Sequence, residues 1–194
     1  MLSGLYISSD GSAEGLRLRV VVLRMGHRIP RDYRVTTHVC LTARAFGAHG
    51  VIVSDVVDTK LEETIRKVVR TWGGPFFIET GPPWRKVVED WLAREGEVIH
   101  LTQYGIPLTD VIEELRCSGR DKLVVVGAKK QPREIYELAT HNVSITNQPH
   151  SEVAALCLFL HFLWRGEELK KEFEGARLKV IPQAKGKKVV RLVG

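Results

Sequence analysis

The sequence predicts an α/β domain with a mostly parallel sheet that is covered by helices on both faces. Short runs of apolar and β-branched residues alternate along the chain with longer amphipathic segments, and this alternation is typical of strand–helix–strand units. Residues 121–127 (DKLVVVG) are apolar over most of their length, as expected for a strand buried on both faces. The length of 194 residues fits one domain of ordinary size.

The expected elements follow this alternation in order. Residues 1–15 are predicted to be a flexible extension, because Ser, Gly and Asp stand where a core element would need apolar residues, and a single domain is expected over residues 16–194. Strands are expected at residues 16–24, 50–55, 75–79, 97–102, 121–127 and 142–145. Helices are expected at residues 59–72, 84–95, 107–118 and 132–139, in addition to a first and a last helix.

The first helix is expected to begin at Asp32, because an aspartate carboxylate can accept hydrogen bonds from the free N–H groups of a first turn. After it, Val35, Val39, Thr42 and Phe46 recur at helical spacing. This spacing predicts that they form one buried stripe.

The last helix is expected to run from a cap at Ser151 to Arg165. It is apolar almost all round, with only Glu152 and His161 breaking the pattern over residues 151–164. Such a helix has to be covered on every side. A short chain does this with difficulty, which favours a homodimer interface; the alternative is a central helix buried within one subunit.

Charge favours a polyanionic partner, since the net charge is +6 and the pI is about 9.3. Residues 24–34 hold four arginines against one acid, and residues 175–194 hold six Lys or Arg and no acid. The two clusters would form one surface if the ends of the chain meet.

Several function classes are disfavoured by what the sequence lacks. No apolar run approaches the length of a membrane span and no signal peptide precedes the domain, so the cytoplasm is the expected location. The three cysteines form no CxxC pair and are expected to be buried thiols, so neither a zinc site nor a disulfide is predicted. Without GxGxxG, GxxxxGK[ST] or HExxH motifs, a dinucleotide oxidoreductase, a P-loop NTPase and a metal site are not expected.

Three strand exits carry unusual residues, and ligands of parallel sheets bind at the carboxyl ends of strands. These exits are residues 101–105 (LTQYG), 127–132 (GAKKQP) and the stretch from residue 145 (ITNQPHSE). Gly127 either lets the backbone approach a ligand or makes a simple turn. His150 either contacts a ligand or is an ordinary loop histidine.

Five segments in order resemble the SPOUT superfamily of S-adenosylmethionine-dependent RNA methyltransferases, within it the branch that methylates ribose 2′-hydroxyls of tRNA. The segments are LRMGHRIPRDYRVTTHVCLTARAFGA, GGPFFIETGPPWRKVV, HLTQYGIPLTDVIEEL, VVVGAKKQPREIYELA and NQPHSEVAAL, which together span most of residues 19–190. The resemblance implies a trefoil knot near the C-terminus, a homodimer, and a cytidine in the T loop of tRNA as the target.

The resemblance also implies that S-adenosylmethionine is bound at the three strand exits, with Lys129 where the family usually has an acid. The implied cofactor residues are Leu101, Gly127, Ala128, Lys129, Lys130, Gln131, Ile145, Thr146, Asn147, Gln148, Pro149, His150, Ser151 and Glu152. No metal is needed, because the group that leaves the methyl is a neutral thioether.

Related ribose methyltransferases use an arginine of the first motif as the base, which makes Arg34 and Arg31 the candidates here, Arg34 first. Because guanidinium is almost never deprotonated in proteins, the alternative is that Arg34 grips a phosphate while a neighbour or water takes the proton. The candidate RNA-binding residues are Arg28, Arg31, Lys185, Lys187 and Lys188. The alternative for the three lysines is a solvated tail.

Three other functions stay open from the sequence. A SPOUT enzyme acting on a base or on another RNA position would differ in its product. A non-catalytic RNA-binding α/β protein would bind tRNA but not S-adenosylmethionine. A small-molecule enzyme would use its basic flanks only for solubility.

Overall fold

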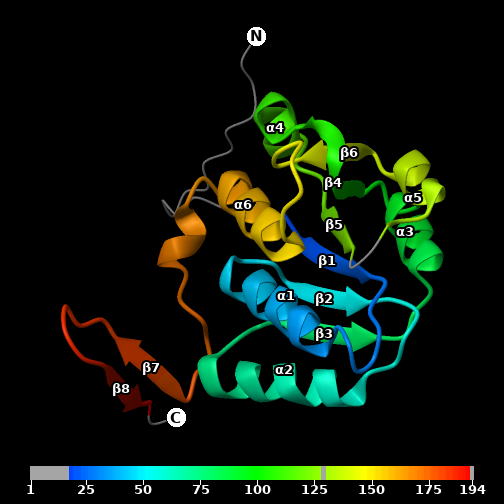
Figure 1. Cartoon of the computed structure of the whole chain (residues 1–194). Coiled ribbons are helices and arrows are strands. Elements are labelled where there is room, and N and C mark those ends of the chain that lie inside the picture. The colour runs from blue at the N-terminus through cyan, green and yellow to red at the C-terminus, as the bar shows by residue number, and fades with distance from the viewer. Residues whose placement is uncertain (1–17, 128–129, 193–194) are drawn as a thin grey trace.

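A six-stranded parallel sheet forms the centre of the protein, as the sequence predicted (Figure 1). The computed structural model describes residues 18–127 and 130–192, so the predicted extension over residues 1–15 lies outside the described residues. The strand order is β3-β2-β1-β5-β4-β6. The strands are β1 (Val20–Met25), β2 (Gly50–Val53), β3 (Phe77–Thr80), β4 (Glu97–Pro107), β5 (Lys122–Gly127) and β6 (His141–Ser144).

Helices cover both faces of the sheet, and the alternation of side chains along β1 separates the two cores. Val20 and Val22 pack with residues of α1, α2, α4 and α6, whereas Val21 and Leu23 pack with residues of α3 and α5. The helices are α1 (Tyr33–Ala45), α2 (Thr59–Trp72), α3 (Trp84–Leu92), α4 (Leu108–Cys117), α5 (Arg133–Leu138), α6 (Glu152–Trp164) and the short 3₁₀ helix η1 (Glu167–Lys170).

The first helix begins after Asp32 as predicted, but two details of the prediction are wrong. Asp32 caps no backbone N–H, because its carboxylate instead accepts hydrogen bonds from Arg28. The buried face is also rotated by one residue. The Thr36 hydroxyl is drawn inward to His27 at 2.9 Å, and Val35 is left 39% exposed. Of the expected stripe, Val39 is fully buried, and the exposure of Thr42 and Phe46 is intermediate.

The last helix starts at the predicted cap, since the Ser151 hydroxyl accepts a hydrogen bond from the Val153 N–H at 3.2 Å. One side of α6 is buried against α1, α4 and the sheet. The other side is only partly covered by the residues that the structure describes, because Leu158 is 42% and Phe162 is 38% exposed. Residues 18–127 and 130–192 therefore do not cover this helix on every side.

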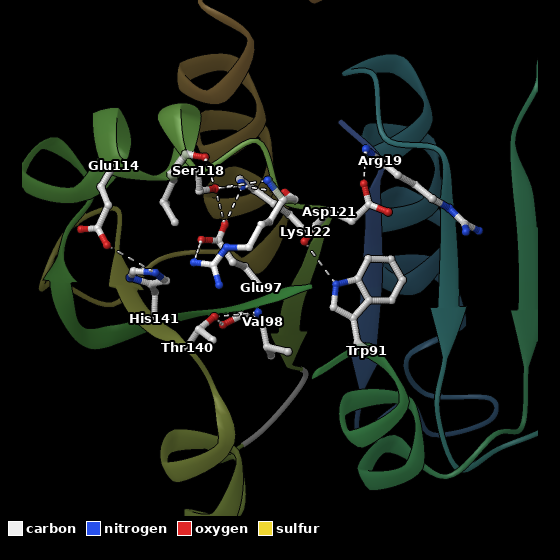
Figure 2. A network of polar contacts seen from close by, with 12 residues as sticks. Arg19, Trp91, Glu97, Val98, Glu114, Ser118, Asp121, Lys122, Thr140 and His141 are labelled. Carbon is white, nitrogen blue, oxygen red and sulfur yellow. Dashed lines mark hydrogen bonds and ion pairs between the residues drawn. The ribbon is translucent and has the colours of Figure 1, made fainter. Parts of the chain in front are cut away.

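A buried ionic network ties the amino-terminal ends of β4 and β5 together (Figure 2). The side chains of Glu97 and Lys122 are both 0% exposed and their charged groups lie 2.6 Å apart. Ser118 donates to the same Glu97 oxygen at 2.9 Å, and Arg120 donates to the other oxygen at 2.6 Å. Every oxygen of the buried carboxylate therefore has a hydrogen-bond partner, as burial of a charge requires.

The C-terminal segment forms a hairpin of two antiparallel strands, β7 (Leu178–Ile181) and β8 (Lys188–Arg191). Figure 1 shows it standing outside the sheet beside one end of α2. A bridge between Gly74 and Glu174 anchors it near the start of β3, which is the amino edge of the sheet. The arginine cluster lies at the other edge, separated by the length of α1, about 20 Å. The two basic clusters therefore do not meet within one chain.

The cysteine prediction is correct only in part. Cys40 is buried, and burial raises the pKa of its thiol to about 12, whereas Cys117 is exposed and the exposure of Cys157 is intermediate. Across residues 18–127 and 130–192, no helix has the length and apolar character to cross a membrane. The same residues contain no group of three His, Cys, Asp or Glu side chains arranged for a metal ion.

Candidate active site

A cavity of about 820 Å³ opens at the carboxyl ends of β4 and β5 and beside the start of α6, a size typical of small-molecule sites. Its position agrees with the strand exits singled out in the sequence. The predicted cofactor residues that line it are Leu101, Gly127, Lys130, Gln131, His150 and Glu152. Ala128 and Lys129 fall in the gap between the two described ranges.

The other predicted cofactor residues in the described part of the chain do not line this cavity. Ile145 packs against the main core, and Ser151 caps α6. Asn147 donates a hydrogen bond to the backbone oxygen of Gln103 at 2.7 Å and so fixes the outer part of β4. The remaining members, all exposed and outside the cavity lining, are Thr146, Gln148 and Pro149.

Gly127 lies close to the side chain of Gln131, and both interpretations of this glycine, approach to a ligand or a simple turn, stay open. A Cβ at this position would lie 1.8 Å from Nε2 of Gln131, so the Gln131 side chain would have to move. Both residues line the cavity. Any side chain at position 127 would therefore change the shape of the wall between β5 and α5.

The sequence analysis did not predict several of the residues that line the cavity. It also predicted a shorter β4 than the structure has. The strand continues to Pro107, and its pairing with β6 shifts register between Leu101 and Ile106. The apolar lining residues Val126 and Ala155 were not predicted. The polar or aromatic lining residues not predicted are His100, Thr102, Gln103, Tyr104, Arg133 and Tyr136. The unusual sequence of the exit at residues 101–105 was a signal for Thr102, Gln103 and Tyr104 alone.

His100 is the most buried of these lining residues, at 1% exposure. Burial lowers the pKa of its imidazole, although a hydrogen bond with Asn142 at 2.9 Å opposes the shift. Its ring also meets the Tyr136 ring edge-on at 4.6 Å between centroids. His100 is therefore a neutral, fixed part of the wall at neutral pH.

A buried arginine orients the carboxylate at the cavity. Arg24 in β1 is 0% exposed, and its Nη2 donates to Glu152 Oε1 at 3.0 Å. Burial lowers the pKa of Arg24, and the negative charge of Glu152 opposes that shift. Arg24 Nη1 has no hydrogen-bond partner among the residues that the structure describes. Because Glu152 lines the cavity, Arg24 fixes a negative charge at the wall of the site.

The four arginines of residues 24–34 divide into two paired members, Arg24 and Arg28, and two free ones. Arg28 holds both oxygens of Asp32, at 2.7 and 3.2 Å, and this contact lowers the pKa of the Asp32 carboxyl. Arg31 and Arg34 are exposed. Their side chains form no hydrogen bond or ion pair with any residue in the described part of the chain. They are available for a ligand anion, although neither lines the cavity.

A second cavity of about 550 Å³ lies beside the first, beyond the ends of β1 and β2. Arg28 lines it, which connects the arginine cluster to the site. Lys130 and Gln131 line both cavities and form their boundary. Beneath the second cavity, His27 is bound through both ring nitrogens, to Asp58 at 3.0 Å and to Thr36 at 2.9 Å.

The fold is also found in solved structures of methyltransferases. The SpoU methyltransferase AviRb from Streptomyces viridochromogenes, solved with AdoMet, superposes with a TM-score of 0.57 at 16% identity. This match covers 84% of the present chain and 62% of AviRb, so the chain spans less than two thirds of that protein. The A. aeolicus TrmH/SpoU tRNA modifying enzyme matches with a TM-score of 0.54 at 16% identity, covering 80% of each chain.

Sequence comparison shows a much closer kinship. A protein of Pyrococcus abyssi named tRNA (cytidine(56)-2′-O)-methyltransferase is 58% identical over 177 residues, which cover 89% of this chain and 88% of the relative. A protein of Methanopyrus kandleri with the same name is 55% identical, covering 91% of this chain and 99% of the relative. The family model described as tRNA ribose 2′-O-methyltransferase, aTrm56, matches residues 72–190. The chain belongs to this family of tRNA ribose 2′-O-methyltransferases.

Proposed function

We propose that the chain transfers a methyl group from S-adenosylmethionine to the ribose 2′-hydroxyl of cytidine 56 in the T loop of tRNA. The observation that carries this proposal is the identity of 58% over 89% of the chain to a relative named for that reaction. A tRNA substrate also supports the expectation of a cytoplasmic location.

The residues at the larger cavity fit the cofactor. Leu101, Val126 and Ala155 provide apolar surface for an adenine ring, and the Glu152 carboxylate provides negative charge toward a sulfonium or an ammonium group. Arg24 keeps that carboxylate in place. The cofactor supplies an activated methyl group when it is bound. The residues of the chain then have to bring the ribose oxygen into line with it and exclude competing water.

The arginine cluster supplies the charge that would hold the RNA backbone near the cavity. Arg34 and Arg31 have free guanidinium groups in and beside the first turn of α1, and Arg28 faces the adjoining second cavity. A guanidinium grips a phosphate through two parallel hydrogen bonds and stays protonated. This supports a phosphate-holding role for Arg34, with a neighbour or water as the proton acceptor.

The test is incubation of the protein with methyl-labelled S-adenosylmethionine and unmodified tRNA, followed by nucleotide mapping. We expect label on one cytidine of the T loop, in a linkage that resists alkaline cleavage because the 2′-oxygen is methylated. Alkali-sensitive label would indicate base methylation instead. Tight tRNA binding with no transfer of label would favour a non-catalytic RNA-binding protein.

We propose further that the protein is a homodimer and that its C-terminal half forms a trefoil knot. The exposed apolar side chains Leu41 of α1 and Leu158 and Phe162 of α6 support the dimer, because α1 and α6 pack side by side. The knot is proposed from the resemblance to the SPOUT superfamily alone.

Phe162→Glu is expected to convert the dimer to a monomer while leaving the fold intact, because it places a charge in the middle of the proposed apolar interface. Sedimentation equilibrium measures the mass, and circular dichroism checks the fold. Leu192→Glu, at a similarly exposed leucine beyond β8, is the matched control and should stay dimeric. Unchanged mass for Phe162→Glu would place the dimer interface elsewhere.

The C-terminal hairpin is expected to contact tRNA phosphates through Lys185, Lys187 and Lys188, all of which are exposed. Replacing Lys187 and Lys188 together by Gln should reduce the slope of log K against log salt by about 2, since each phosphate contact contributes about 0.7–0.9. Filter binding between low and moderate salt measures the slope. The exposed pair Lys67 and Lys170, replaced in the same way, gives the effect of lost charge alone. Equal slopes for the two double variants would indicate a solvated hairpin.

A further inference from the structure

We propose that the second cavity, next to the arginine cluster, is the pocket for the base of the target nucleotide and that Asp55 recognises the exocyclic amine of cytosine there. This inference rests on the proposed ribose methylation. Nothing in the family match or in the names of the relatives assigns this cavity a ligand.

The position of the cavity follows from what the reaction needs. The attacking ribose oxygen has to lie within about 3–3.5 Å of the methyl group, so the ribose sits at the rim of the larger cavity. Lys130 and Gln131 form the boundary between the two cavities. A nucleotide whose ribose lies at this boundary has its base either in bulk water or in the second cavity. A volume of about 550 Å³ is within the range of small-ligand pockets.

The walls of the second cavity have the chemistry of a base pocket. Trp84, at the start of α3, offers an aromatic surface on which an unstacked base can stack. Met25 is an apolar lining residue on β1. Arg28 and Lys130 also line the cavity and carry positive charge suited to the flanking phosphates. Aromatic and cationic groups together are the usual means of holding a single-stranded nucleotide.

Asp55 supplies a directional acceptor at this wall. Its Oδ1 accepts a hydrogen bond from the backbone N–H of Trp84 at 3.1 Å, which fixes the carboxylate beside the indole-bearing residue. Its Oδ2 has no hydrogen-bond partner among residues 18–127 and 130–192. The residue sits in the left-handed region, at φ 67°, just beyond the carboxyl end of β2. A carboxylate oxygen held in this position can accept a hydrogen bond from a donor group of the base.

The functional groups of the two pyrimidines determine which base Asp55 prefers. Cytosine carries an amino group at position 4, which donates to a carboxylate, whereas uracil has a carbonyl oxygen there that a carboxylate repels. Asp55 therefore favours cytosine over uracil. Asparagine at this position would present either an acceptor or a donor and would lose that preference, while its amide oxygen could still accept from the Trp84 N–H.

The experiment compares methylation of two tRNA transcripts, one with cytidine and one with uridine at the target position, by the wild-type protein and by Asp55→Asn. The ratio of kcat/KM for the two transcripts is expected to fall by about tenfold or more in Asp55→Asn, the size of one lost discriminating contact. Any effect of uridine on tRNA folding is common to both proteins and cancels in the comparison. Asp90→Asn is the matched control and should keep the wild-type ratio. Asp90 lies on the exposed face of α3, the helix that carries Trp84.

Trp84→Leu provides a second, independent readout. Loss of stacking is expected to raise KM for tRNA by about fivefold or more, with the affinity for S-adenosylmethionine unchanged, and Trp84→Phe should restore part of the loss. An unchanged cytidine-to-uridine ratio in Asp55→Asn would overturn the inference. If the wild-type protein methylates neither transcript, the proposed function itself is wrong, and the two failures are thereby distinguished.

Discussion

Lys122→Met is expected to lower the free energy of unfolding by about 3–5 kcal/mol, the cost of leaving one partner of a buried ion pair alone. The substitution keeps the length of the side chain but removes the ammonium that lies 2.6 Å from Glu97 (Figure 2). Ser118 and Arg120 remain, but Arg120 is half exposed, so Glu97 would lose its only fully buried cationic partner among the described residues. Guanidinium denaturation followed by circular dichroism measures the change.

The double variant Lys122→Met with Glu97→Leu is the control for this prediction. It removes both charges from the same buried place, and an apolar pair of similar volume often restores most of the stability lost by breaking a buried ion pair. A double variant that is as unstable as the single one would mean that shape, not uncompensated charge, causes the loss.

The same network gives the prediction a pH dependence. Burial raises the pKa of Glu97, but the hydrogen bonds from Lys122 and Ser118 and the positive charges of Lys122 and Arg120 outweigh burial and hold the pKa below its ordinary value of 4.5. A carboxyl with a lower pKa in the folded than in the unfolded chain stabilises the fold fully above pH 4.5 and loses this contribution as the pH falls through the folded pKa. The difference between wild type and Lys122→Met should therefore be large at pH 7 and smaller at pH 3.

Local patterns were sufficient to predict most of the fold. The helix predicted at residues 59–72 is α2 without change, because its apolar residues recur at one period and Asp58 provides a cap that accepts from the Leu61 N–H. Errors arose where other contacts compete with the expected one. Asp32 could have capped α1, but Arg28, four residues earlier, takes its carboxylate. The C-terminal hairpin depends on a distant anchor at Gly74, which no local pattern reveals.

The residues of the candidate site could be predicted where they lie at a strand exit. They could not be predicted where their role depends on an ion pair between distant parts of the sequence. Gly127 stood out as a glycine that follows an apolar strand, and Gln131 was implied by the family resemblance; both line the larger cavity. Arg24 was not found, because a charged residue in an apolar strand gives no sign of its partner. Its partner Glu152 lies 128 positions away in the sequence. The boundary shared by the two cavities is likewise a property of the folded chain alone.

The free guanidinium groups decide where the strongest effect on activity should appear. Arg24 already has Glu152 as an anionic partner, and Arg28 has Asp32. Arg34 and Arg31 have no such partner within the described chain. Both lie at the carboxyl edge of the sheet, on the same side as the two cavities. One of them is therefore the expected contact for the phosphate next to the target ribose.

Arg34→Ala is expected to reduce kcat for tRNA methylation at least about a hundredfold, because a ribose that is no longer held in line with the methyl group loses the advantage of orientation. The affinity for S-adenosylmethionine, measured by isothermal titration calorimetry, should stay unchanged, since Arg34 does not line the larger cavity. Arg31→Ala, one turn away, is the matched control and should have a smaller effect. A comparable loss of cofactor affinity in Arg34→Ala would contradict the assignment.

Arg34→Lys separates the two roles that the sequence left open for this residue. A lysine keeps the positive charge but loses the two parallel hydrogen bonds to phosphate, so an anchoring role predicts a raised KM for tRNA and an unchanged pH profile of kcat. A general base would behave differently, because an amine deprotonates at lower pH than a guanidinium. The rate of Arg34→Lys would then rise with pH over a range where the wild type is flat. We expect the first result, since the guanidinium of Arg34 is exposed and has no carboxylate partner in the described part of the chain.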